Sequence, residues 1–110
     1  MSYIPKRGDA IWLDFNPQTG REQAGRRPAF VVSPASYNGK VGLALLCPVT
    51  SRVKGYPFVV SIPEGFPVSG VVLSDQLKSL DWRQRRAAFI CVLPESVTQE
   101  VLKKVEALLR

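Results

Sequence analysis

The sequence contains no histidine and only two cysteines among its 110 residues. Without histidine, the chain has no paired imidazoles for acid–base catalysis, no Ser-His-Asp triad and few ways to bind a transition metal. Cys47 and Cys91 each lie within a short apolar run, where we expect small buried hydrophobic side chains rather than a disulfide. No cluster of cysteine and histidine is present to bind zinc, so we expect neither a metal nor a cofactor.

Long hydrophobic runs are also missing. No apolar stretch approaches the roughly 20 residues that a membrane-spanning helix needs. The first eight residues are polar and include Pro5, Lys6 and Arg7, so they lack the apolar stretch of a secretory signal peptide. We therefore expect a cytoplasmic protein with reduced thiols and no membrane partner.

Acidic residues are few relative to basic ones. Fifteen Lys and Arg face nine Asp and Glu, which gives a net charge of +6 and a pI near 9.8. This excess favours an anionic partner, with nucleic acid the first candidate, although it is also compatible with solubility alone. The length predicts a single domain over residues 1–110, and so short a chain would gain from burying more surface in a dimer.

Proline and glycine punctuate the chain about every eight to twelve residues, which is typical of an all-β barrel. The apolar runs between them predict strands at residues 9–15, 28–33, 41–49, 56–62, 71–77 and 87–93. Asn38-Gly39 is interpreted as a turn, and residues 18–27 as a polar loop.

After Pro94 the apolar residues recur every three or four positions, which predicts a C-terminal helix with one apolar stripe. The stripe consists of Val97, Val101, Leu102, Val105, Leu108 and Leu109. Ser96 and Gln99 are interpreted as a capping box at its start. The predicted fold is therefore mostly β, a small barrel of about six strands with a C-terminal α-helix.

The densest polar cluster is the segment from Gly20 to Pro28, which holds a carboxylate, an amide and three guanidiniums. The planar donor fork of arginine matches phosphate oxygens, so this segment suits a nucleic-acid backbone. A solvated surface loop is the alternative interpretation.

Four sequence blocks resemble the MazF/PemK family of toxins. They are Glu22-Gln23-x-Gly25-x-Arg27-Pro28, Pro48-Val49-Thr50-Ser51, Lys54-Gly55-Tyr56-Pro57-Phe58 and Asp75-Gln76-x-Lys78-Ser79-x-Asp81-Trp82. With Ile11-Trp12-Leu13 before them, they occur in the family's order across nearly the whole chain. The resemblance implies an SH3-like barrel of the CcdB/PemK kind that forms a homodimer and cleaves messenger RNA at short sequences. It also implies an acidic, MazE-like antitoxin whose unstructured tail covers the active site.

The resemblance makes Arg27 and Thr50 the catalytic positions, with Glu22 close by. It implies attack by the RNA's own 2'-hydroxyl, which leaves a 2',3'-cyclic phosphate and a 5'-hydroxyl without a metal. Because a guanidinium stays protonated, we interpret Arg27 as a phosphate clamp and candidate proton donor. Thr50 is assigned to hydrogen-bond a non-bridging oxygen, and Glu22 is the candidate base. Ordinary interpretations remain, since Thr50 ends a predicted strand and Glu22 could pair with a nearby arginine.

Further polar and aromatic residues are predicted to bind RNA. They are Gln23, Arg26, Ser51, Lys54, Tyr56, Phe58, Asp75, Gln76, Lys78 and Arg86. Tyr56 and Phe58 are candidates for stacking on bases, and so is Trp82. Each ring could instead pack in the core or at a dimer interface, and that is what we expect of Trp12.

Two departures separate this chain from the PemK-like branch of the family. Arg21 and Leu73 stand where that branch has a histidine and an arginine, so Asp75 is interpreted as a supporting or RNA-binding residue rather than a base. Two other functions remain open. One is a toxin of the same fold that inhibits DNA gyrase, although such toxins end in Trp-Gly-Ile and this chain ends in Leu108-Leu109-Arg110. The other is a barrel that binds RNA without cutting it.

Overall fold

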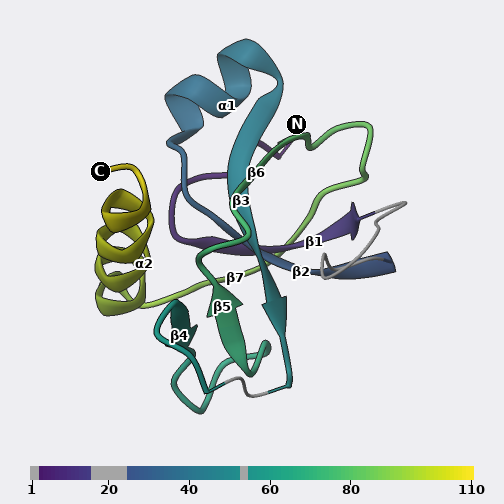
Figure 1. The fold of residues 1–110 in the computed structure, drawn as a ribbon. Coiled ribbons are helices and arrows are strands. Elements are labelled where there is room, and N and C mark those ends of the chain that lie inside the picture. Colours follow the sequence, from purple (N-terminus) through teal and green to yellow (C-terminus); the bar gives the residue numbers. More distant parts are fainter. Residues whose placement is uncertain (1–2, 16–24, 53–54) are drawn as a thin grey trace.

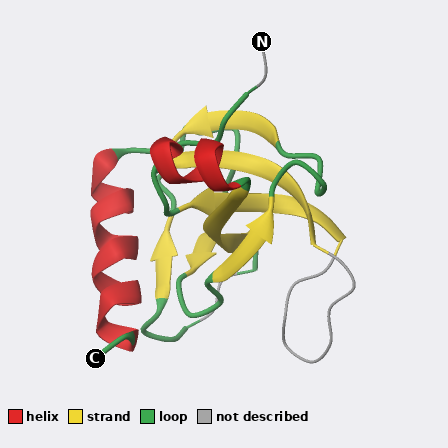
Figure 2. Ribbon diagram, turned by 90° about the horizontal axis from the view of Figure 1, so that it is seen from above, coloured by secondary structure: helices red, strands yellow, loops and turns green. Residues whose placement is uncertain are grey.

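The computed structural model describes residues 3–15, 25–52 and 55–110 and shows an antiparallel sheet with two helices (Figure 1). The strands are β1 (Asp9–Phe15), β2 (Gly25–Val31), β3 (Leu43–Thr50), β4 (Val59–Ser61), β5 (Val71–Leu73), β6 (Lys78–Asp81) and β7 (Ala88–Val92). The helices are α1 (Ala35–Val41) and α2 (Glu95–Leu108). Viewed from above, α2 stands along one side of the strands (Figure 2).

Strand β3 organises the sheet because it pairs with three other strands. The order is β4-β5-β3-β2-β1-β7, and β6 pairs with the first half of β3. All these pairings are antiparallel. In the described part of the chain no pairing joins the end strands β4 and β7, so the sheet is not closed. The mostly β fold with a C-terminal helix is confirmed, whereas the closed barrel stays a prediction.

Apolar side chains of β1, β2 and β3 alternate between two faces of the sheet, as the pleat requires. One face carries Phe30 and Cys47 and packs with Val101 of α2; we call this the helix-side cluster. The other carries Leu13 and Leu46 and packs with residues near Trp82; we call this the Trp82-side cluster. Full burial of a large apolar side chain such as Phe30 or Leu13 contributes about 1.5–3 kcal/mol. Both faces of the sheet centre are therefore covered.

The predicted cysteine and helix positions are largely confirmed. Both cysteines are free thiols, Cys47 fully buried and Cys91 half-buried. The helical stripe is buried at Val97, Val101 and Val105, but its last two leucines are exposed. The capping box is wrong, because α2 begins at Glu95 after Pro94 and no side chain caps it; Gln99 instead donates to the carboxylate of Glu95 at 2.7 Å. Among the described residues no helix is long and apolar enough to cross a membrane.

The turn predicted at Asn38-Gly39 is wrong, because both residues belong to α1. Asn38 is fully buried, and its amide nitrogen donates to the carbonyls of Pro5 (2.8 Å) and Ser33 (3.0 Å). The Ser33 hydroxyl donates to the Asn38 side-chain oxygen at 2.5 Å. These partners, Ser33 five residues earlier and the distant Pro5, satisfy a side chain that would otherwise favour a surface turn.

Strand boundaries also differ from the prediction where pairing partners decide them. Strand β2 begins at Gly25, three residues early, because Gly25, Arg26 and Arg27 pair with the end of β1. The strand predicted over 56–62 is confined to β4, and that over 71–77 to β5. A seventh strand, β6, follows and pairs with β3, so the count of about six is one short.

Candidate active site

Strands β2 and β3 position Arg27 and Thr50. Their ladder pairs Ala29 with Pro48, Phe30 with Cys47 and Val31 with Leu46. Continued two residues past the Ala29–Pro48 pair, this register would place Arg27 opposite Thr50, where β3 pairs with Val71 of β5. By strand alternation, positions 27 and 50 fall in the rows of Ala29 and Leu46, which pack on the Trp82 side of the sheet. The register therefore predicts that two residues 23 positions apart in the sequence approach each other.

Thr50 ends β3 at a tight turn and is only 4% exposed. Its hydroxyl oxygen accepts a hydrogen bond from the backbone N–H of Arg52 at 3.2 Å. A hydroxyl has one proton to donate as well as lone pairs to accept. The Thr50 hydroxyl thus accepts one hydrogen bond from the backbone and, by its chemistry, can also donate one.

Gly70 holds the Thr50 turn in place and was not identified from the sequence. A Cβ added to Gly70 would lie 2.0 Å from the Thr50 carbonyl oxygen and 2.8 Å from the Cα of Ser51. Gly70 also has a backbone φ of +110°, which residues other than glycine rarely adopt. The available signal was the Ser69-Gly70 dipeptide just before a strand, which indicates a turn but not its contact with Thr50.

A hollow of about 270 Å³ lies beside Arg27 and Ser51. Its lining is formed by Trp12, Arg27, Pro28, Val49, Ser51, Pro67, Val68, Ser69 and Ile90. Ligand pockets begin at about 300 Å³, so the hollow has room for part of a nucleotide. Trp12 is 42% exposed here, so its assignment to the core is wrong and packing in a dimer stays a prediction.

Arg26 and Arg86 lie in a second group, which we call the arginine cluster, together with Asp14. Arg26 contacts one oxygen of the Asp14 carboxylate at 2.8 Å, and the Nε of Arg86 contacts the other at 2.9 Å. Arg26 also donates to the backbone carbonyl of Arg86 at 2.8 Å. Hydrogen bonds from Arg86 and then Arg26 lower the pKa of Asp14, so the carboxylate is ionised at neutral pH.

Hydrogen bonds that involve the backbone tie the arginine cluster to the fold. Arg85 donates from its side chain to the Asp14 carbonyl at 3.1 Å, and the Asp14 N–H donates to the Arg85 carbonyl at 3.0 Å. Arg86 has a φ of +55°, which is unusual for a residue with a side chain. Asp14 was missed from the sequence, although a lone carboxylate at a strand end facing an arginine-rich segment is a usable signal.

Tyr56 and Asp75 form a third group near the start of β4. The Tyr56 hydroxyl donates to the Asp75 carboxylate at 3.1 Å, and burial followed by this hydrogen bond raises the pKa of Tyr56. The N–H of Ser74 donates to the carbonyl of Phe58 at 3.0 Å, which ties the same segment to the end of β5. Asp75 therefore contacts Tyr56, and its supporting or RNA-binding role stays a prediction. Lys78 lies further along, on β6 opposite Leu46.

Other predicted residues are not brought to these groups. Trp82 is 3% exposed and its indole N–H donates to the Asn38 carbonyl at 3.0 Å, so the stacking role considered for it is wrong. Glu22, Gln23 and Lys54 lie outside the described residues. Within the described ranges no three Asp, Glu, Cys or His side chains gather as metal ligands.

The known proteins that this chain resembles match it over nearly its whole length. The chain is 45% identical over 107 residues to the endoribonuclease toxin MazF of Escherichia coli K12, covering 97% of this chain and 96% of that protein. The crystal structure of MazF from Deinococcus radiodurans superimposes with a TM-score of 0.94 at 56% identity, covering 98% of both chains. A chain of the MazE–MazF crystal structure from the same organism matches with a TM-score of 0.89 at 56% identity, covering 98% of this chain and 97% of that chain. Residues 6–109 match the family described as PemK-like, MazF-like toxin of type II toxin–antitoxin systems, and the chain belongs to this family of endoribonuclease toxins.

Proposed function

We propose that this toxin, as a single domain over residues 1–110, cleaves single-stranded RNA without a metal at the edge where Arg27 lies opposite Thr50. The proposal is supported by the register of β2 and β3, whose continuation past the Ala29–Pro48 pair would align these two residues on one face of the sheet. The hollow beside Arg27 and Ser51 has room for part of a nucleotide.

The proposed reaction uses a nucleophile from the substrate. The 2'-hydroxyl loses its proton to a base and forms a bond to the adjacent phosphorus, and the bond from phosphorus to the 5'-oxygen breaks. That oxygen leaves with a proton from an acid, which gives a 2',3'-cyclic phosphate and a 5'-hydroxyl. Arg27 binds the phosphate and is the candidate acid, Thr50 donates to a non-bridging oxygen, and Glu22 is the candidate base.

RNA contacts away from the reacting phosphate belong to the remaining predicted residues. Tyr56 and Phe58 are half-exposed rings that can stack on bases, and Asp75 orients Tyr56 through its hydrogen bond. Gln23, Ser51, Lys54, Gln76 and Lys78 are proposed to line the RNA path. Arg26 and Arg86 bind phosphate while they also hold Asp14.

Three further properties belong to the proposal. The toxin acts in the cytoplasm as a homodimer, which buries surface that a chain of this length leaves exposed. The proposal also assigns the fold to the SH3-like barrels, with the end strands β4 and β7 unpaired in the described residues. An acidic antitoxin resembling MazE neutralises it, because a net charge of +6 per chain attracts a carboxylate-rich segment. The MazE–MazF assembly solved for a 56% identical relative supports this partner.

The decisive experiment is cleavage of a single-stranded RNA in the presence of EDTA. We expect fragments that end in a 2',3'-cyclic phosphate and begin with a 5'-hydroxyl, identified by mass spectrometry. A substrate with deoxyribose at the cleavage point should remain intact. Cutting of that substrate at the normal rate, or a strict need for magnesium, contradicts the mechanism. Binding of RNA with no cleavage at all indicates the non-catalytic barrel instead.

A further inference from the structure

Lys104 of α2 contacts the segment that precedes β4. Its Nζ donates to the backbone carbonyl of Pro57, and it lies 3.3 Å from the carbonyl oxygen of Val59. The side chain is 26% exposed, and Glu100, one helical turn earlier, lies 3.7 Å from the same Nζ. The ammonium therefore joins α2 to two carbonyls that flank Phe58.

The same segment is held from its other side by residues that follow β5. The Ser74 N–H donates to the Phe58 carbonyl at 3.0 Å, and Asp75 accepts from the Tyr56 hydroxyl at 3.1 Å. Three consecutive carbonyls, those of Pro57, Phe58 and Val59, thus accept from two different elements. Both rings proposed to stack on bases, Tyr56 and Phe58, lie in this doubly held segment.

We propose that Lys104 is a positioning residue for RNA binding, because its ammonium fixes the backbone that presents Tyr56 and Phe58. This inference rests on the proposed function of those two rings. A hydrogen bond from a charged donor is stronger than one between neutral groups, and its removal leaves two carbonyls without that donor. Because Arg27 and Thr50 lie on β2 and β3, the loss should weaken RNA binding and leave the chemical step nearly unchanged.

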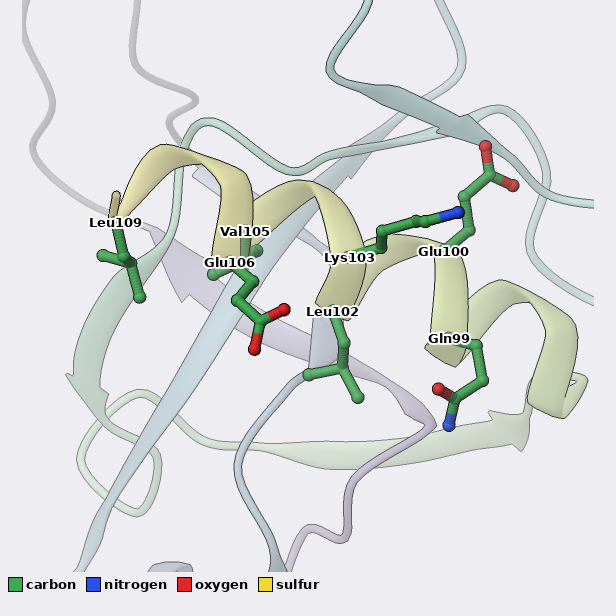
Figure 3. A pocket seen from close by; sticks show the side chains of 7 residues that line it. All are labelled: Gln99, Glu100, Leu102, Lys103, Val105, Glu106 and Leu109. Carbon is green, nitrogen blue, oxygen red and sulfur yellow. The ribbon is translucent and has the colours of Figure 1, made fainter.

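Lys103 supplies a matched control. It is exposed and lines a shallow groove on the outer side of α2 with Leu102 and Glu106 (Figure 3). Within the described residues it makes no hydrogen bond or ion pair. Lys103→Met and Lys104→Met therefore remove the same charge from adjacent positions of one helix, and only the second removes the contacts with Pro57 and Val59.

The experiment compares both variants with the unmodified toxin. For Lys104→Met we expect KM for RNA to rise about tenfold relative to Lys103→Met, the scale of one charge-assisted hydrogen bond, with kcat within about twofold. Amide hydrogen exchange should accelerate at Val59 and Ser74 in Lys104→Met alone. Lys104→Arg, which keeps a charged donor, should recover part of the affinity.

Two results overturn the inference. One is equal KM and equal exchange rates for the two methionine variants. The other is a fall in kcat without a rise in KM, which places Lys104 in the chemistry or in global stability. Binding of a deoxy-substituted, uncleavable RNA is measured in parallel. If the unmodified toxin binds this RNA but cuts no RNA, the proposed function fails while the binding comparison still decides the role of Lys104.

Discussion

Arg26 and Arg27 are adjacent in the sequence but belong to different regions of the molecule. Arg26 shares the Asp14 carboxylate with Arg86 in the arginine cluster. Arg27, paired with Leu13 at the next position of β2, falls by strand alternation on the other face of the sheet. The comparison shows that strand alternation, rather than local composition, assigns two adjacent guanidiniums to opposite faces of the sheet.

The difference leads us to expect that the two regions bind RNA differently. In the arginine cluster an incoming phosphate competes with Asp14 for the same guanidinium groups. The negative charge of Asp14 therefore offsets part of their attraction for phosphate. At the proposed Arg27–Thr50 edge, we expect the Thr50 hydroxyl to donate to an oxygen of the phosphate. We therefore expect the edge to determine the rate of cleavage, and the arginine cluster to adjust affinity.

Replacement of Arg27 or Thr50 by alanine should give the largest effect. Each should lower the single-turnover cleavage rate by roughly a hundredfold or more, the scale of losing a key charge or oxyanion donor. Arg26→Ala, which changes the neighbouring residue on the other face, should lower this rate much less. Circular dichroism checks that the variants fold. The distinction between the two regions would be lost if Arg27→Ala unfolded, or if Arg26→Ala and Arg27→Ala lowered the cleavage rate equally.

Gly70→Ala should disturb the edge without removing any functional group. The added Cβ meets the Thr50 carbonyl at 2.0 Å, and a displacement of about 1 Å costs up to a hundredfold in rate. Backbone strain at a positive φ should also lower the free energy of unfolding by about 1–3 kcal/mol. Gly65→Ala is the control, because Gly65 has a φ of +100° but nothing within 4 Å of an added Cβ. Equal cleavage rates for the two variants would show that Gly70 does not position Thr50.

Asp14→Asn should give a smaller effect, on affinity rather than on rate. Without the carboxylate, the Arg26 and Arg86 charges are no longer offset, so RNA binding should tighten at low salt. The slope of log K against log salt should steepen by about 0.7, the value for one further phosphate contact on a single strand. Glu64→Gln, at an exposed position in the turn after β4, is the charge-matched control. A slope equal to that of the control would mean that Asp14 does not restrain the arginines.

The pH dependence of the arginine cluster should be the weakest effect. The pKa of Asp14 is lowered in the folded protein, so its ion pairs are present above the unfolded value of about 3.9 and are lost only as pH falls through the lowered value. Between pH 5 and 8 the unmodified toxin and Asp14→Asn should therefore differ by a constant factor in RNA affinity, measured by fluorescence anisotropy. A difference that changes with pH in this range would assign the titration to another group.

Local patterns predicted part of this structure because their causes are local. The apolar run in Asp9–Phe15 predicted β1 with its observed bounds, and the three- to four-residue spacing after Pro94 predicted α2. The start of β2 was missed because Gly25, Arg26 and Arg27 form a strand only when paired with β1. Asn38-Gly39 was misread as a turn because the hydrogen-bond partners of Asn38 lie in other segments of the chain.

The sequence by itself determined the family and the mostly β composition, since ordered motifs and residue patterns can be read along the chain, and through the family resemblance it indicated Arg27 and Thr50 as the site to examine. Only the tertiary structure decided that Asp14 binds both Arg26 and Arg86, that Gly70 packs on the Thr50 turn and that Lys104 holds the Pro57–Val59 backbone. Each of these contacts joins residues at least 12 positions apart. No local pattern specifies such a contact, because it exists only once the strands have paired and α2 has packed against them.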